Sequence, residues 1–166
     1  MKKILLLLLI IGFASSCKCK KNAVENNKMT QMDCPENAAC RTEILKESKM
    51  VLVQDVTNKP FYTIEEQKGT TVYHYLMSEN KDPQYQDGGY REEIIFELPS
   101  DFKDGTISGK DLLKTNALFG VFCYCKEKAG YYTINDGTIT KKGNTFSIEL
   151  PMIVEGQKIR KFQLKF

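Results

Sequence analysis

The chain has 166 residues, 42% of them hydrophobic and 27% charged, with six cysteines, one histidine and no tryptophan. This composition is that of a single globular domain and excludes collagen-like, low-complexity and multi-span membrane proteins. The formal net charge is +3; without Lys2 and Lys3, which we assign to a removable leader, 22 of the 24 basic residues remain against 21 acidic ones. The resulting charge of +1 gives no general case for nucleic-acid binding.

The N-terminus has the features of a secretory signal peptide, which we expect over residues 1–16. Lys2 and Lys3 precede an unbroken apolar run at 4–11, and small residues follow it. The run is about half of the roughly 20 residues that a membrane-spanning helix needs. A basic start, a short apolar middle and small residues at the end are typical of export signals, so we do not expect a permanent transmembrane anchor here.

The segment Ala14-Ser15-Ser16-Cys17 at the end of this signal resembles the lipobox of bacterial lipoproteins. The resemblance implies that Cys17 becomes the first residue of the mature chain and carries a diacylglycerol thioether and a fatty acid such as palmitate. Several acyl chains hold a protein on a membrane far more firmly than one myristoyl chain does. Ala14 departs from the family pattern, which usually has Leu or another larger aliphatic residue at that position.

The residues after Cys17 indicate where such a lipoprotein would be sorted. In Gram-negative lipoproteins of this kind, an Asp after the acylated cysteine favours the inner membrane, and an acidic run favours the cell surface. Residues 18–21 are Lys-Cys-Lys-Lys and carry neither signal. The resemblance therefore implies the outer membrane, with the protein facing the periplasm. The whole chain also looks like uncharacterised small envelope lipoproteins of Gram-negative bacteria.

The rest of the chain divides into a tether and one domain. Residues 17–33 are expected to form a flexible lipidated tether, because their few apolar residues cannot bury enough surface to order them. Residues 34–166 are expected to form a single β-rich domain. Segments rich in β-branched and aromatic residues predict strands at 49–56, 70–77, 90–98, 117–125, 131–134, 145–150 and 159–166.

Short turn sequences such as Asn135-Asp136-Gly137 join consecutive predicted strands, which indicates an antiparallel meander. We therefore predict an all-β domain, either a β-sandwich or a small barrel, with at most one short helix, at 108–114. The phrase Asp-Gly-Thr-Ile occurs at 104–107 and again at 136–139, which we interpret as repeated turn chemistry.

Two of the predicted strands differ in the faces that they bury. At 90–98, alternation places Glu92 with apolar residues on one face and Glu93 with Glu97 on the other. This pattern predicts a half-buried strand whose outer face is a solvated acidic stripe. At 117–125 both faces are apolar, which predicts a central strand covered on both sides.

The cysteines after the acylated one predict disulfides, the default in an oxidising compartment. The candidates are Cys34 and Cys40 at the start of the domain, and Cys123 and Cys125 on a predicted strand. On an extended strand, positions 123 and 125 lie about 6.7 Å apart, close to the upper limit for a bridge. We therefore expect Cys34–Cys125 with Cys40–Cys123, or the crossed pairs, and Cys19 is left unpaired.

Two alternatives stay open for these four cysteines, a metal site and buried free thiols. Soft thiolates suit copper(I) or zinc. Neither spacing is the short Cys-x2-Cys of strong zinc motifs, and oxidation competes with a thiolate cluster in this compartment. We therefore assign no metal and no other cofactor.

No catalytic residue is predicted, and the chain lacks G-x-S-x-G, Walker, H-E-x-x-H and G-x-G-x-x-G motifs. His74, the only histidine, lies between two tyrosines, where a packed or surface role is the ordinary case. Arg91 and the glutamates of 90–98 would suit a glycosidase, whose chemistry needs two carboxylates at set distances. Glu79, Asp82 and Asp87 could offer oxygen ligands to calcium. We favour a solvated surface for both sets.

We therefore expect a membrane-anchored lipoprotein that is not an enzyme and that serves as a binding or structural module of the cell envelope. Its partners would be the membrane, through the N-terminal lipid, and an envelope protein or glycan. Two alternatives are an inhibitor of an invading hydrolase such as lysozyme and a thiol-based copper or redox protein. The fold class alone does not decide between these functions.

Overall fold

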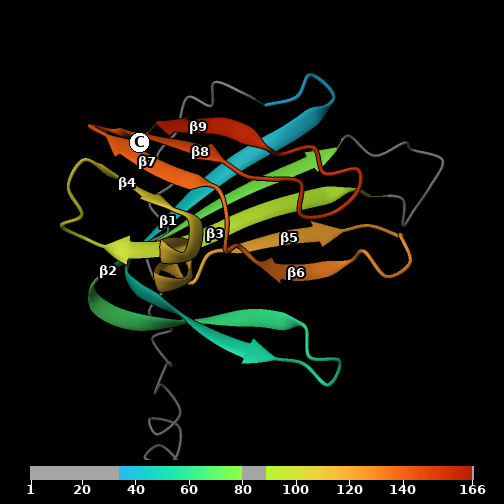
Figure 1. The fold of residues 1–166 in the computed structure, drawn as a ribbon, viewed down its shortest axis with the longest axis horizontal. Coiled ribbons are helices and arrows are strands. Elements are labelled where there is room, and N and C mark those ends of the chain that lie inside the picture. The colour runs from blue at the N-terminus through green and yellow to red at the C-terminus, as the bar shows by residue number, and fades with distance from the viewer. Residues whose placement is uncertain (1–33, 80–88, 166) are drawn as a thin grey trace, which may run out of the picture.

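The computed structural model describes residues 34–79 and 89–165, in which two antiparallel sheets face each other as a β-sandwich (Figure 1). The larger sheet consists, in spatial order, of β1 (Ala38–Gln54), β2 (Pro60–Glu79), β3 (Arg91–Pro99), β5 (Leu118–Phe122) and β6 (Gly130–Thr133). The smaller sheet consists of β4 (Gly105–Ser108), β7 (Thr138–Lys142), β8 (Thr145–Glu149) and β9 (Lys161–Lys165). The predicted all-β class is confirmed, as a sandwich and not as a closed barrel within the described residues.

The chain passes between the two sheets three times. β1, β2 and β3 are neighbours in sequence order, and β4 then lies in the smaller sheet. The 3₁₀ helix η2 (Gly109–Thr115) leads back to β5 and β6, and β7, β8 and β9 complete the smaller sheet. This helix lies where a short one was predicted, and it buries Leu112 while Leu113 stays exposed. Within 34–79 and 89–165, no helix has the length and apolar character needed to cross a bilayer.

The two Asp-Gly-Thr-Ile phrases lie side by side. β4 and β7 pair with Thr106 opposite Thr140 and Ile107 opposite Ile139, and the two threonine hydroxyls lie 2.9 Å apart. Neither strand was predicted, because the Asp-Gly pair that begins each phrase was interpreted as a turn. The Thr-Ile part of each phrase is instead strand.

Aromatic side chains from both sheets form the core between them. The ring of Tyr73 on β2 stacks on Phe96 of β3 at 5.3 Å and meets the edge of Phe146 of β8 at 4.8 Å. Tyr75, two residues further along β2, stacks on Phe162 of β9 at 4.4 Å. Alternate residues of β2 therefore supply the larger sheet's half of the core, as the period of a strand requires.

The β1–β2 hairpin is much longer than the sheet and bends back over it. β1 has 17 residues and β2 has 20, against nine or fewer in every other described strand. The register shifts between Lys46 and Ser48, where Glu47 has φ 51° and Gly69 on β2 has φ 82°. These left-handed residues turn the ribbon, so that its end, residues 48–66, lies next to β6 (Figure 1). We call residues 48–66 the arm.

The arm changes the burial of the central strands. Met50 packs with Val72, Ile95 and Leu118, which lie on the outer face of the larger sheet. β3 is consequently buried on both faces, and the prediction of a half-buried strand was wrong because it did not foresee this cover. β5 is covered on both faces as predicted, but it ends at Phe122, and β3 is the middle strand.

Candidate functional site

A tight loop at 55–59 forms the end of the arm and leaves Val56 fully exposed. One carboxylate oxygen of Asp55, Oδ1, accepts hydrogen bonds from the hydroxyl of Thr57 at 2.6 Å, the amide of Thr57 at 2.7 Å and the amide of Lys59 at 2.9 Å. These bonds, that of the Thr57 hydroxyl first, lower the pKa of Asp55 below its ordinary value. The loop therefore presents an apolar side chain beside an ionised carboxylate.

Glu97 of β3 holds the base of the arm. Its oxygen Oε2 accepts a hydrogen bond from the backbone amide of Met50, and its oxygen Oε1 accepts one from Nδ2 of Asn116 at 2.7 Å. Glu97 was predicted to belong to a solvated stripe, and this prediction was wrong. Both of its oxygens bind groups that lie far away in the sequence.

The end of the arm is held by the β5–β6 connection. Nζ of Lys59 donates a hydrogen bond to the carbonyl of Ala129 at 2.6 Å, and the ring of Tyr62 meets that of Tyr131 edge-on at 5.3 Å. The arm is thus fixed at two places, at Ala129 in the β5–β6 connection and at Tyr131 on β6. Its orientation is set by contacts that do not involve its most exposed residues.

Several large apolar side chains of the arm remain exposed. Val56 is fully exposed, and four others are 38–39% exposed: Leu52, Val53, Phe61 and Ile64. Val53 lies directly opposite Phe61, so these two share one face of the ribbon. Alternation places that face opposite the one on which Met50 and Tyr62 contact the sheet.

A buried polar cluster surrounds Glu93, which is only 4% exposed, on the outer face of the larger sheet. Oε2 of Glu93 accepts a hydrogen bond from the hydroxyl of Tyr131 at 2.9 Å and lies 3.0 Å from Nε2 of His74. Oε1 of Glu93 lies 2.8 Å from Nε of Arg91. The other ring nitrogen of His74 lies 3.5 Å from Oε2 of Glu43.

The partners of Glu93 favour its charged form. Burial by itself raises the pKa of Glu93, but the hydrogen bond and charge of His74, the Tyr131 hydroxyl and the Arg91 guanidinium together hold it below its ordinary value. Burial and the charge of Glu93 in turn raise the pKa of the Tyr131 hydroxyl. Both oxygens of Glu93 are occupied, so its partners hold the carboxylate in place.

Glu92, on the opposite face of β3, is completely buried and holds the 151–160 loop. It accepts hydrogen bonds from the hydroxyl of Tyr90, from the amide of Lys158 at 2.7 Å and from the amide of Ile159 at 2.6 Å. Glu92, Glu93 and Glu97, with Arg91, were the residues that suited a glycosidase. Glu92 points to the opposite face of the sheet from Glu93 and Glu97, so it pairs with neither. The oxygens of Glu93 and Glu97 are bound to groups of the protein itself.

The four cysteines of the domain form two local disulfides, Cys34–Cys40 and Cys123–Cys125, with Cα–Cα distances of 6.0 and 5.1 Å. The prediction that bridges join the start of the domain to the strand was wrong. Cys40 lies opposite Met77, which lies opposite Glu92, which in turn lies opposite Val121. Three strand spacings, about 14 Å, therefore separate Cys40 from Val121 on β5, and no disulfide spans that distance.

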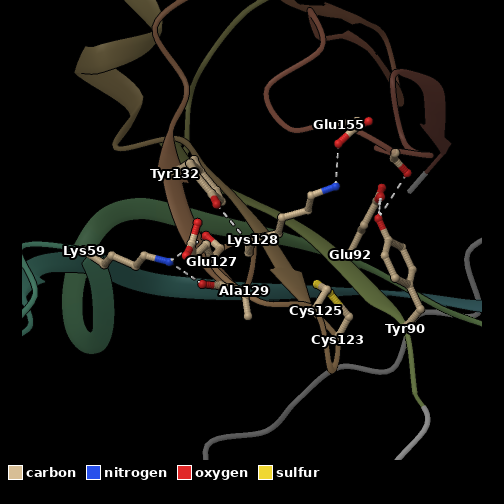
Figure 2. Close-up of a disulfide and its surroundings, with 11 residues drawn as sticks. Lys59, Tyr90, Glu92, Cys123, Cys125, Glu127, Lys128, Ala129, Tyr132 and Glu155 are labelled. Carbon is tan, nitrogen blue, oxygen red and sulfur yellow. Dashed lines mark hydrogen bonds and ion pairs between the residues drawn. A yellow bond between two sulfur atoms is a disulfide. The ribbon is translucent and has the colours of Figure 1, made fainter.

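The Cys123–Cys125 bridge lies just beyond the end of β5 (Figure 2). Because the strand ends at Phe122, the chain bends there, and the two cysteines are closer than they would be on an extended strand. The connection that follows is held by other contacts. The hydroxyl of Tyr132 donates to the carbonyl of Lys128 at 2.8 Å, and Nζ of Lys128 donates to Glu155 at 2.8 Å (Figure 2).

The remaining predicted residues fall partly outside the structure. The lipid-attachment residue Cys17, the tether with Cys19, and Asp82 and Asp87 lie outside the described residues. Glu79 is described and pairs with Nζ of Lys158. Among the described residues, no group of three or more His, Cys, Asp or Glu side chains is placed to hold a metal ion.

An open hollow of about 610 Å³ lies on the outer face of the smaller sheet, over β7, β8 and β9. Its polar lining consists of Thr138, Thr140, Ser147, Glu149, Lys161 and Gln163. The Thr140 hydroxyl is bonded to that of Thr106, and Nζ of Lys161 lies 3.5 Å from Glu149. Three of these polar side chains, those of Thr140, Glu149 and Lys161, therefore already have a partner within the protein.

The exposed apolar arm is thus the feature of the described residues best suited to contact another molecule. No protein-family model, no curated protein and no solved structure matches the chain.

Proposed function

We propose that this chain is a cell-envelope lipoprotein, held at the periplasmic face of the outer membrane by lipid on Cys17, whose sandwich domain binds another envelope protein through the arm. The resemblance of Ala14–Cys17 to a lipobox supports the anchor. The exposed apolar arm supports the binding role. The oxygens of Glu92 and Glu93 are all occupied by groups of the protein itself, which supports a binding role over acid–base catalysis.

The exposure of the arm's apolar side chains is the observation that carries this proposal. The arm already packs Met50 and Tyr62 against the sheet, yet Val53 and Phe61 on its other face and Val56 at its end contact water. Grouped apolar side chains on a surface are typical of protein-binding sites. Because the arm is held by Glu97 and Lys59, its contact face is ordered before a partner binds, which reduces the entropy lost on binding.

The chemistry of the arm favours a protein over a membrane or a glycan. Segments that lie in a membrane interface carry Lys and Arg beside their apolar residues. The loop at the end of this arm has one such residue, Lys59, whose Nζ is bound to the carbonyl of Ala129. It also carries Asp55, whose lowered pKa keeps it anionic and repels it from acidic lipids. A glycan needs many hydrogen-bonding groups, whereas Val53, Val56 and Phe61 have none in their side chains.

In vivo crosslinking tests the arm directly. A photo-crosslinking amino acid replaces Val56 in the full chain, and a second strain carries it at Met152, which is 59% exposed outside the arm. We expect one discrete envelope-protein adduct from position 56 and none from 152. The adduct should disappear with Val53→Glu and Phe61→Glu, and persist with Met152→Glu.

The identified partner is then purified and its affinity for the chain measured. Val53→Glu with Phe61→Glu should weaken binding at least tenfold, because each carboxylate would be buried without a counter-charge. Adducts only with lipid, only with a second copy of this chain, or equally from positions 56 and 152 would overturn the proposed partner class.

The anchor has a separate test in the same cells. Cys17→Ala removes the thiol that the lipid requires, so the protein should leave the membrane fraction and the detergent phase. Cys19→Ala is the matched control and should leave the protein membrane-bound. If Cys17→Ala stays in the membrane fraction, the lipid anchor is wrong, whatever the crosslinking shows.

A further inference from the structure

The Cys123–Cys125 disulfide adds little to the stability that the surrounding contacts already give. Its cysteines are separated by two positions in the sequence, whereas those of Cys34–Cys40 are separated by six. The stabilisation that a disulfide gives by restricting the unfolded chain falls as its loop shortens. A bridge across a single residue therefore restricts the unfolded chain very little.

The connection that contains this bridge is held by contacts that do not involve sulfur. Lys59 binds the carbonyl of Ala129, the Tyr132 hydroxyl binds the carbonyl of Lys128, and Lys128 pairs with Glu155 (Figure 2). The bridge also joins no two strands, since both cysteines follow β5 directly. Opening it would leave the sandwich and its connections in place.

The bridge is accessible from solvent, and its two halves differ. Both cysteines are half-buried, and Tyr124 between them is 98% exposed. Cys123 packs against the hydrophobic core, whereas Cys125 is not among the residues packed there. A thiolate approaching from solvent thus has its access on the Cys125 side. Exposed disulfides that constrain little are the ones that exchange readily with thiols.

We propose that Cys123–Cys125 is a thiol–disulfide exchange site that oxidises the dithiol of a partner protein. A partner thiolate attacks Sγ of Cys125, the disulfide bond breaks, and its electron pair leaves on Sγ of Cys123, which takes up a proton. The partner's second thiolate then attacks its own sulfur in the mixed disulfide and releases Cys125 as a thiol. The partner loses two electrons and two protons to become a disulfide, and this chain gains them as two thiols.

A redox titration compares the two bridges in one molecule. The full chain with Cys19→Ser is equilibrated in reduced and oxidised glutathione, quenched in acid and alkylated, and each cysteine pair is quantified by mass spectrometry of its peptide. The equilibrium constant for oxidation of glutathione should be at least tenfold larger for Cys123–Cys125 than for Cys34–Cys40, a difference of about 30 mV. Equal constants, or a harder reduction of Cys123–Cys125, would overturn the proposal.

Single variants test which sulfur is attacked. Cys123→Ser leaves Cys125 as the free thiol of the pair, and Cys125→Ser is its matched control. With oxidised glutathione as the probe, Cys123→Ser should form a mixed disulfide at least tenfold faster than Cys125→Ser. Equal or reversed rates would overturn the assignment of Cys125.

The double variant Cys123→Ser, Cys125→Ser tests the claim that the bridge is not structural. Its urea-unfolding midpoint should stay close to that of the parent chain, while Cys34→Ser, Cys40→Ser shows a larger drop. A double variant at 123 and 125 that fails to fold would show a structural bridge and overturn the proposal.

Discussion

The ring of Tyr131 occupies the space above Gly120 that a side chain at position 120 would fill. The two residues lie opposite each other on β5 and β6, and a Cβ added to Gly120 would stand 2.6 Å from Cε1 of Tyr131. Because the ring lies over this glycine, its hydroxyl reaches across β5 to Glu93 on β3. One residue without a side chain thus connects β6, β3 and, through Tyr62, the arm.

Gly120→Ala tests this relationship. The added methyl group must displace the Tyr131 ring, so we expect the free energy of unfolding to fall by about 1 to 3 kcal/mol, as for other overpacked sites. Urea unfolding measures the change. Gly105→Ala is the control, because its added Cβ would meet only ordinary contacts at 3.9 Å. Equal stability of the two variants would mean that the ring moves aside at no cost.

The Glu93 cluster predicts a pH-dependent contribution to stability. The folded-state pKa of Glu93 lies below its ordinary value of 4.5, which we take for the unfolded chain. Its contribution is therefore fully present above about pH 4.5 and is lost as the pH falls through the lower folded-state pKa. Glu93→Gln should lower the free energy of unfolding most at about pH 6, with a smaller difference at about pH 3.

The measurement on Glu93→Gln needs a reference variant, because several ionisable groups face Glu93. They are His74 on β2 with its neighbour Glu43 on β1, Arg91 on β3 and Tyr131 on β6. Glu149→Gln, at an exposed ion pair, serves as the reference at each pH. A Glu93→Gln deficit that stays constant or grows on acidification would contradict the lowered pKa.

Replacing Glu92 should destabilise the protein mainly at the loop that this residue holds. Glu92→Gln keeps one oxygen but places an amide nitrogen at an atom that now accepts a hydrogen bond from a backbone amide, either that of Lys158 or that of Ile159. We expect a loss of about 2 to 4 kcal/mol, because a buried donor is left without an acceptor. Hydrogen exchange should show the loss of protection concentrated at residues 151–160. Full protection there would mean that the carboxylate does not hold the loop.

Local sequence patterns predicted which face of a strand each side chain takes. They missed the burial of those faces, which depends on residues far away in the chain. Alternation placed Glu92 and Glu93 on opposite faces of β3, because side chains of a strand alternate whatever else is present. It did not indicate what covers each face. Part of the cover comes from Met50, more than forty residues earlier in the chain, which packs with Ile95 and whose amide binds Glu97.

The candidate site was missed for a related reason. The apolar residues at 49–56 correctly predicted a strand, but nothing in them distinguishes a strand in a sheet from an arm that leaves it. The bend depends on Glu47 and Gly69 adopting positive φ together, at positions 22 residues apart that β-pairing brings close. The cysteine pairing likewise depends on register and on the end of β5 at Phe122, and spacing alone specified neither.

Replacing Lys59 should speed hydrogen exchange in the arm without changing the stability of the sandwich. Lys59→Met keeps the length of the side chain but removes the donor to the Ala129 carbonyl, so the arm loses one of the contacts that hold its end to the sheet. A hydrogen bond of this kind has a net worth of about 0.5 to 1.5 kcal/mol, so amides of the arm should exchange about two- to tenfold faster. Global unfolding in urea should change little, because the sandwich core is untouched. Lys68→Met, an exposed lysine beyond the arm, is the matched control and should leave arm exchange unchanged. If Lys59→Met also leaves it unchanged, Lys59 does not hold the arm, and the contacts of Glu97, Met50 and Tyr62 suffice.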